Sequence, residues 1–151
     1  MRKYLFRAKR NDNGEWVEAK SVADCTFEDG DVRWYAGAGQ PGAFALDEYG
    51  NILEAATKGE CLFYEVDPET IGQYTELTDK NGKKVFEGDV LLVYGTDTAV
   101  VEWDETTAMF MAVFGYTDAD FASLISQYPD VEVIGNIHDN PELRMNDNDS
   151  T

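Results

Sequence analysis

The chain has 151 residues, 43% of them hydrophobic and 13% aromatic, so it can bury a core and is not disordered. Its formal net charge is −18, and between Lys84 and Arg144 it has twelve carboxylates and no lysine or arginine, which disfavours direct nucleic-acid binding. It has no apolar run of signal-peptide or bilayer-spanning length, so we expect a soluble, cytoplasmic protein without membrane partners.

The N-terminal region predicts paired strands joined by short turns. Residues 4–8 and 15–18 predict a hairpin around the turn at 11–14. Two more strands, 22–27 and 32–35, are expected around a turn at 28–31. The stretches that follow are a glycine-rich loop, an ambiguous segment that could begin a short helix, and an apolar strand: residues 37–42, 52–59 and 61–66. Residues 1–70 are therefore expected to form a β-rich subdomain, with its softest boundary at 67–70.

The second half predicts more strands and one helix. The expected strands are residues 71–75, 84–86, 90–94, 99–103, 109–114 and 131–137. Apolar residues recur at helical spacing from Phe121 to Tyr128, Thr117 and Asp120 resemble a capping box, and Pro129 ends the helix. The predicted fold class is mainly β (α+β): an N-terminal β-hairpin region packed on a C-terminal SH3-like small barrel, residues 71–143, with one short helix. Residues 144–151 are expected to be a flexible tail.

Three segments carry a recognisable pattern in order along the chain. They are residues 1–8, followed by Trp16-Val17 after the turn; residues 73–90, which run from Gln73-Tyr74-Thr75 to Gly88-Asp89-Val90; and residues 133–143. Together they resemble the YopX family of phage and prophage proteins. The chain departs from the family at Glu76, where glycine is usual, and residues 19–64 match nothing in it. The resemblance implies a phage-encoded, mostly β protein of unassigned activity, and it supplies no catalytic residues.

The motif residues are explained by turn chemistry. The segment 79–82 suits a tight hairpin turn, because asparagine and glycine adopt positive φ. The segment 87–89 resembles the entry turn of SH3-like barrels, and 136–141 predicts an extended exit. We therefore expect structural roles for the following residues: Gln73, Tyr74, Asp79, Asn81, Gly82, Glu87, Gly88, Asp89, Gly135, Asn136, Asn140 and Pro141.

Other candidate sites fit ordinary structure better than chemistry. The glycine pattern at 37–42 contains Pro41 and precedes a strand-like stretch, so it does not suit a phosphate. His138, Cys25 and Cys61 lack paired metal-ligand spacing, and the two cysteines are expected to be free, buried thiols. The acidic clusters 28–31 and 147–149 lack a complete calcium-loop pattern, and no serine lies in a nucleophile elbow. We expect no enzyme activity, metal or cofactor.

Three functions from different classes are compatible with these observations. The leading hypothesis is a phage accessory protein that binds an unknown host or phage protein and forms a homo-oligomer, since aromatic residues and sheet edges both favour association. An acidic DNA mimic that inhibits a host DNA-binding protein is the first alternative. An SH3-like nucleic-acid-binding module, suggested by residues 87–90, is the second. Trp16, Trp34, Trp103 and the tyrosines could form a binding surface, although predicted strands also bury aromatic residues.

Overall fold

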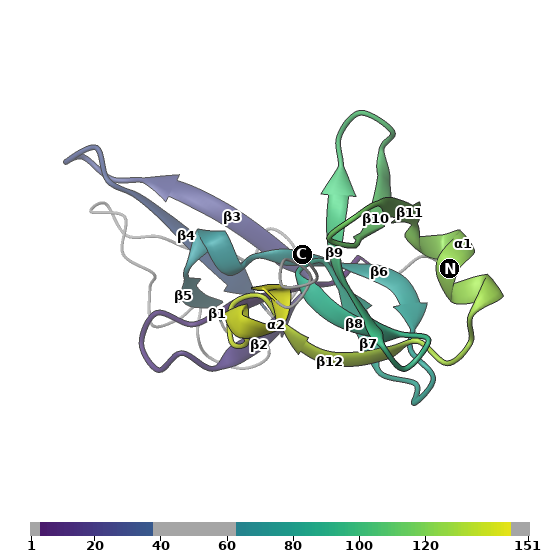
Figure 1. The fold of residues 1–151 in the computed structure, drawn as a ribbon. Coiled ribbons are helices and arrows are strands. Elements are labelled where there is room, and N and C mark those ends of the chain that lie inside the picture. The colour runs from purple at the N-terminus through teal and green to yellow at the C-terminus, as the bar shows by residue number, and fades with distance from the viewer. Residues whose placement is uncertain (1–3, 38–62, 146–151) are drawn as a thin grey trace. The chain divides into compact units, whose positions relative to one another are not determined.

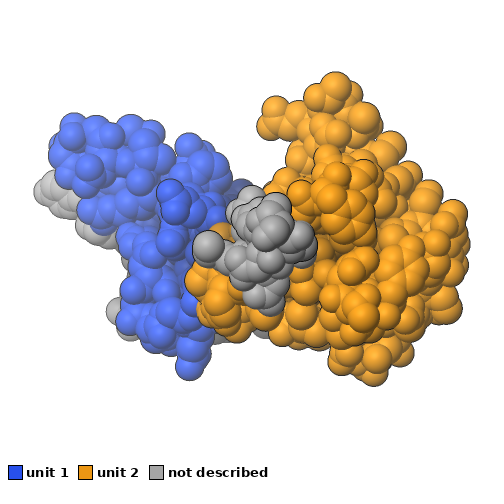
Figure 2. All heavy atoms as spheres, viewed as in Figure 1, with its two compact units in different colours: residues 1–73 blue, residues 74–151 orange. Residues whose placement is uncertain are grey.

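The computed structural model describes residues 4–37 and 63–145, and the chain divides into two compact units, Met1–Gln73 and Tyr74–Thr151 (Figures 1 and 2). The protein is mainly β, with antiparallel sheets, as the sequence predicted. The parts of these expectations that fall on 38–62, including Cys61, and on 146–151 lie outside the described residues. Within the described ranges, none of the helices has the length and apolar character needed to cross a membrane.

Unit 1 contains two sets of antiparallel strands. Strand β1 (Phe6–Lys9) pairs with β2 (Trp16–Ala19), and β3 (Ser21–Thr26), β4 (Val32–Gly37) and β5 (Phe63–Val66) form a sheet in that order. Both N-terminal hairpins predicted from the sequence are therefore confirmed. The side chains that form the small core of this unit are Ala8, Ala19, Ala36 and Val66.

The segment expected to be a soft boundary has ordered hydrogen bonds. Asp67 caps the 3₁₀ turn η2 (Pro68–Thr70) by accepting from the Glu69 amide at 3.0 Å. Thr70 is buried; its hydroxyl donates to the Asp67 carbonyl at 2.6 Å and accepts from the Lys9 amide at 2.8 Å. One threonine side chain thus ties this turn to strand β1.

Strand β6 (Gly72–Thr78) carries the chain from unit 1 into unit 2. Its first two residues pair with β1, and its later residues pair with β7 (Lys84–Phe86). The main sheet of unit 2 has the order β11-β10-β9-β8-β12. Its strands are β8 (Asp89–Val93), β9 (Asp97–Asp104), β10 (Met109–Val113), β11 (Asp118–Asp120) and β12 (Glu132–Asn136). The SH3-like barrel is not confirmed, because among the described strands no closed barrel is found.

The described part of unit 2, residues 74–145, contains two short helices, whereas the sequence predicted one. The predicted helix is present as α1 (Phe121–Gln127), but its N-cap is Asp120 rather than Thr117: the Asp120 carboxylate accepts from the amides of Ala122 and Ser123. The second helix, α2 (Pro141–Met145), begins at a proline, which needs no amide hydrogen bond at that position. The expectation of an extended exit at 136–141 is therefore wrong: β12 ends at Asn136, the chain turns so that the Asn140 amide donates to the Asn136 carbonyl at 2.8 Å, and α2 follows.

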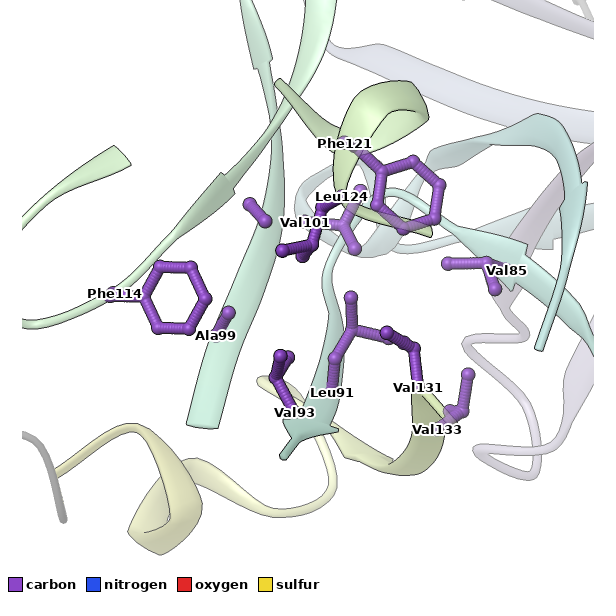
Figure 3. Close-up of a cluster of buried hydrophobic side chains, with 11 residues drawn as sticks. Val85, Leu91, Val93, Ala99, Val101, Phe114, Phe121, Leu124, Val131 and Val133 are labelled. Atoms are coloured by element: carbon purple, nitrogen blue, oxygen red, sulfur yellow. The ribbon is translucent and has the colours of Figure 1, made fainter. Parts of the chain in front are cut away.

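The core of unit 2 lies between the sheet and α1. Figure 3 shows Phe121 and Leu124 of the helix beside strand residues such as Val101 and Leu91. Phe121 is 1% exposed, and full burial of such a side chain contributes about 2–3 kcal/mol. This core fixes the position of the sheet. The side chains in the turns and at the hairpin ends lie outside it.

Candidate functional site

Asp79, one of the motif residues, is buried and binds three backbone amides. Its Oδ1 accepts from Asn81 at 2.8 Å and from Lys83 at 2.9 Å, and its Oδ2 accepts from Val133 at 3.0 Å. Burial raises the pKa of this carboxyl, but the amides of Val133, Lys83 and Asn81 more than compensate, so its pKa lies below the ordinary value. Asp79 therefore closes the β6–β7 turn and attaches it to β12, a strand 54 residues further along.

The motif around Gly88 is a second structural junction. Asp89 is 1% exposed, and its Oδ2 accepts from the Phe86 amide at 2.8 Å. Gly88 has φ +92°, its amide donates to the Val101 carbonyl, and its carbonyl accepts from Ile137. Glu87 lies half-buried in the same turn. The three residues connect β7 and β8 to β9 and to the chain after β12.

The C-terminal motif depends on a close approach at Gly135. A Cβ at this position would lie 2.5 Å from Asn140 Oδ1 and 2.9 Å from Leu143 Cδ1. Asn140 Oδ1 accepts from the Asn136 amide, and Asn136 Oδ1 accepts from His138 and Asp139. Pro141 then begins α2. The motif thus forms a compact turn in which the side chains of Asn136 and Asn140 accept hydrogen bonds from backbone amides.

The remaining motif residues belong to strands and turns. Gln73 pairs with Phe6 of β1, and the ring of Tyr74 lies 5.5 Å from that of Phe86. Asn81 is exposed in the β6–β7 turn, where Gly82 has φ +78°. In the structure the twelve motif residues therefore lie in turns and strand contacts, and they do not form one reactive cluster.

The described residues contain no group of three or more His, Cys, Asp or Glu side chains arranged to hold a metal ion. Cys25 is a free, half-buried thiol, while Cys61 lies outside the described residues. His138 is half-buried in the turn after β12. Asp29 accepts from the Asp31 amide in an exposed turn, the role expected for that acidic cluster.

An aromatic pair, exposed Trp103 and half-buried Phe110, marks the β9–β10 hairpin. Trp103 and Phe110 are cross-strand partners, and their rings meet edge to face with centroids 5.0 Å apart. The same face of the hairpin carries Val101 and Ala112 into the core, because alternate residues of a strand share a face. Trp103 continues that face beyond the core and is 43% exposed. Figure 1 shows the hairpin tip standing out from the rest of unit 2.

We call this pair the hairpin surface (Trp103, Phe110). Met109, which is 37% exposed near the same tip, pairs with Asp104 and lies on the opposite face of the hairpin. Carboxylates flank Trp103 in the sequence at Glu102, Asp104 and Glu105. Glu102 and Asp104 alternate with Trp103 along β9 and so lie on the opposite face, and Glu105 follows in the turn at the hairpin tip.

A second aromatic group, the tyrosine cluster (exposed Tyr94 and Tyr116 with half-buried Tyr128), lies beside Asp97. The rings of Tyr94 and Tyr128 meet edge to face with centroids 4.4 Å apart, and the Tyr116 hydroxyl donates to Asp97 Oδ2 at 3.2 Å. A hydrogen bond with Tyr128, partial burial and the nearby charge of Asp97 raise the pKa of Tyr94 to about 12. The three rings come from the β8–β9 turn, the β10–β11 loop and the end of α1.

Tyr94 occupies an unfavourable backbone position. Its φ is +59° and that of Gly95 is +71°, and the Thr96 amide donates to the Val93 carbonyl across the turn. Hairpin turns of this kind favour asparagine, aspartate or glycine, and other residues are strained by about 1–2 kcal/mol at positive φ. Tyr94 thus lies at a turn position whose backbone conformation favours a different residue type.

Sequence reasoning found the aromatic residues but could not separate the exposed ones from the core. The structure half-buries Trp16 and Trp34, buries Tyr35 and exposes Trp103. The sequence predicted Tyr94 as the last residue of a strand at 90–94, whereas the structure ends β8 at Val93 and places Tyr94 in the turn; the glycine that follows, Gly95, was the available signal. Nothing in the sequence indicated that Tyr116 and Tyr128 would lie near Tyr94.

Comparison with known proteins gives a family and a fold. The family model described as YopX protein matches residues 5–144. The crystal structure of protein EF1440 from Enterococcus faecalis is similar, with 25% identity and a TM-score of 0.50, covering 93% of this chain and 97% of that one. A search among curated proteins gave no match.

Proposed function

The chain belongs to the YopX protein family, and on that basis we propose that it is a phage accessory protein that binds another protein through the hairpin surface. The observation that carries the proposal is the exposure of Trp103. It lies at the end of a face of the β9–β10 hairpin whose other residues, Val101 and Ala112, are buried in the core. Tryptophan is enriched among the residues that dominate binding energy, and apolar surface left in solvent commonly marks an interaction site.

The geometry favours a hairpin that inserts into a partner. Trp103 is held by Phe110 and by strand pairing to the buried part of β9, so little side-chain freedom is lost on binding. The flanking carboxylates and the absence of Lys and Arg between 84 and 144 indicate the partner's chemistry: an apolar pocket with lysine or arginine at its rim.

Affinity purification followed by a purified-pair measurement tests the proposal. The tagged chain is exposed to lysate from bacteria that carry the phage, next to Trp103→Ser and the control Tyr4→Ser, which changes an equally aromatic, 63% exposed residue of unit 1. We expect the wild type and the control to recover the same protein. For the purified pair, we expect Trp103→Ser to weaken binding about 30-fold, the ratio for a central interface residue.

Two outcomes would contradict the proposal. One is a strict monomer by light scattering together with no specific protein recovered, since neither self-association nor a partner would then exist. The other is a partner whose binding is unchanged by Trp103→Ser but is competed by duplex DNA and lost at high salt. That result would favour the DNA mimic, whose carboxylates replace phosphates.

A further inference from the structure

The chain contains the dipeptide Asn-Gly twice, each time in a hairpin turn. Asn13-Gly14 lies between β1 and β2, and Asn81-Gly82 lies between β6 and β7. Asparagine is a thermally labile residue, and glycine after it increases the lability, because a residue without a side chain leaves its amide nitrogen open to the preceding side-chain carbonyl. Both turns are therefore candidates for a spontaneous modification, the loss of the asparagine amide group.

The two turns are alike in what the reaction needs first. All four residues are exposed, and Gly14 and Gly82 have φ of +72° and +78°, with no other part of the chain within 4 Å of the place of a Cβ. Each glycine amide donates to a backbone carbonyl, Gly14 to Arg10 at 2.9 Å and Gly82 to Asp79 at 3.0 Å. Neither nitrogen can attack until its turn opens locally, so the ease of opening decides between the two sites.

The β6–β7 turn is held in place on both sides of Asn81. One oxygen of the Asp79 carboxylate accepts from the amides of Asn81 and Lys83, and the other accepts from Val133 in β12. The Lys80 amide also donates to a carbonyl just before β12, at 3.0 Å. Ring closure requires a backbone rotation between the asparagine and the glycine, and this rotation would break the hydrogen bond from Lys83. The turn therefore resists the reaction.

The β1–β2 turn is held less firmly around Asn13. Asn11 is attached to Glu65 by two hydrogen bonds, but the described hydrogen bonds of the next three residues stay within the turn. One of them favours the reaction: the Glu15 amide donates to Asn13 Oδ1 at 2.9 Å. A donor at this oxygen polarises the side-chain carbonyl and stabilises the negative charge that develops there when its carbon is attacked.

We propose that Asn13 is a site of spontaneous deamidation and that Asp79 protects Asn81 from the same reaction. The Gly14 nitrogen loses its proton and attacks Asn13 Cγ, which closes a five-membered succinimide ring. The Cγ–Nδ2 bond breaks, and ammonia leaves with a proton. Water then opens the ring at either carbonyl and leaves aspartate or isoaspartate at position 13, with one more negative charge. The hairpin surface takes no part, so this modification is independent of the proposed function.

Incubation of the purified full chain at mildly alkaline pH, followed by peptide mapping with mass spectrometry, measures both rates in one sample. We expect deamidation at position 13 to be about tenfold faster than at position 81, the ratio that corresponds to one hydrogen bond to a charged group. The same incubation in concentrated urea is the reference, since unfolding should make the two rates similar. Equal rates in the folded protein, or no modification at position 13, would overturn the proposal.

Variants of Asp79 test its protective role. Asp79→Ala should raise the rate at Asn81 about tenfold and leave the rate at Asn13 unchanged, and Asp79→Asn, which keeps one acceptor oxygen, should raise it less. Gly135→Ala is the matched control, because its new Cβ destabilises unit 2 through contacts with the chain after β12 and not with the turn. NMR signals of unit 2 verify that each variant is folded. Unchanged deamidation of Asn81 in both Asp79 variants, or equal acceleration by Gly135→Ala and Asp79→Asn, would overturn this role.

Discussion

Replacing Asp79 with alanine removes the acceptor for three backbone amides at once. Two of them, from Asn81 and Lys83, belong to exposed turn residues and can turn to water after the change. The third comes from Val133, which is 9% exposed, and it would remain buried without an acceptor. The alanine variant therefore isolates the cost of an orphaned amide in the core of unit 2.

The size of the effect follows from these three contacts. A hydrogen bond to a charged group contributes about 1.5–3 kcal/mol, and an unsatisfied buried donor costs about 1–3 kcal/mol. Counting the Val133 contact in full and the two turn contacts in part, we expect Asp79→Ala to lower the free energy of unfolding of unit 2 by about 3–5 kcal/mol. Asp79→Asn should cost less, about 2–3 kcal/mol, because its Oδ1 still accepts while its amide group opposes the Val133 donor.

Urea unfolding followed by NMR signals of unit 2 measures this loss, and hydrogen exchange of the Val133 amide locates it. The pH dependence has a definite sign. Because the pKa of Asp79 is lowered in the folded state, its stabilisation is complete above the unfolded value of about 4 and is lost as the pH falls through the folded-state pKa. Asp79→Asn should abolish this part of the acid sensitivity.

Asp104 provides the matched control. Its carboxylate also accepts from a turn amide, that of Thr106 at 2.9 Å, but in an exposed turn of the same unit. Asp104→Asn should change stability far less than Asp79→Asn. A loss below 1 kcal/mol for Asp79→Ala, or unchanged exchange of the Val133 amide, would refute the assignment of Asp79 as the attachment between the β6–β7 turn and β12.

Three other predictions concern separate contacts. Gly135→Ala should destabilise unit 2 by about 1–3 kcal/mol in thermal unfolding, because the new Cβ would lie 2.5 Å from a side-chain oxygen, and wild-type stability would contradict the close packing. Thr70→Val should lower the stability of unit 1 by about 1–3 kcal/mol by leaving the Lys9 amide without its acceptor, as urea unfolding would show; a neutral result would mean that water replaces the hydroxyl. Ultraviolet titration should find Tyr94 ionising at about 12, and Tyr128→Phe should lower that pKa; no change would exclude the hydrogen bond as its cause.

The sequence predicted local structure well because local chemistry decides it. The turn at 79–82 contains residues that tolerate the backbone it needs, and the helix near 121–127 follows from apolar spacing. The capping residue was mistaken by one turn: Asp120 matched the second position of a capping box but acts as the cap itself. Strand β11 was missed, since its three residues, Asp118–Asp120, carry little β-propensity and are held by pairing with β10.

Long-range contacts could not be predicted from the same information. Asp79 was identified as a turn residue, and half of its role is local, but its bond to Val133 depends on where β12 lies in the sheet. The predicted SH3-like barrel is not supported by the structure, for a related reason. The entry turn at 87–89 fits several sheet arrangements, and only the order β11-β10-β9-β8-β12 shows which one forms.

The buried carboxylates also change how the strong negative charge is interpreted. Asp79 and Asp89, both in the family motif, are 6% and 1% exposed, and each accepts backbone amides inside unit 2. Their charge stabilises the fold and is not accessible to a binding partner. The charge open to a partner comes from exposed carboxylates such as Glu105 and, in part, from half-buried ones such as Asp104 and Asp97. Under the proposed function, exposed Trp103 and the carboxylates near the hairpin tip predict a partner with apolar and cationic groups rather than one that recognises a plain array of phosphates.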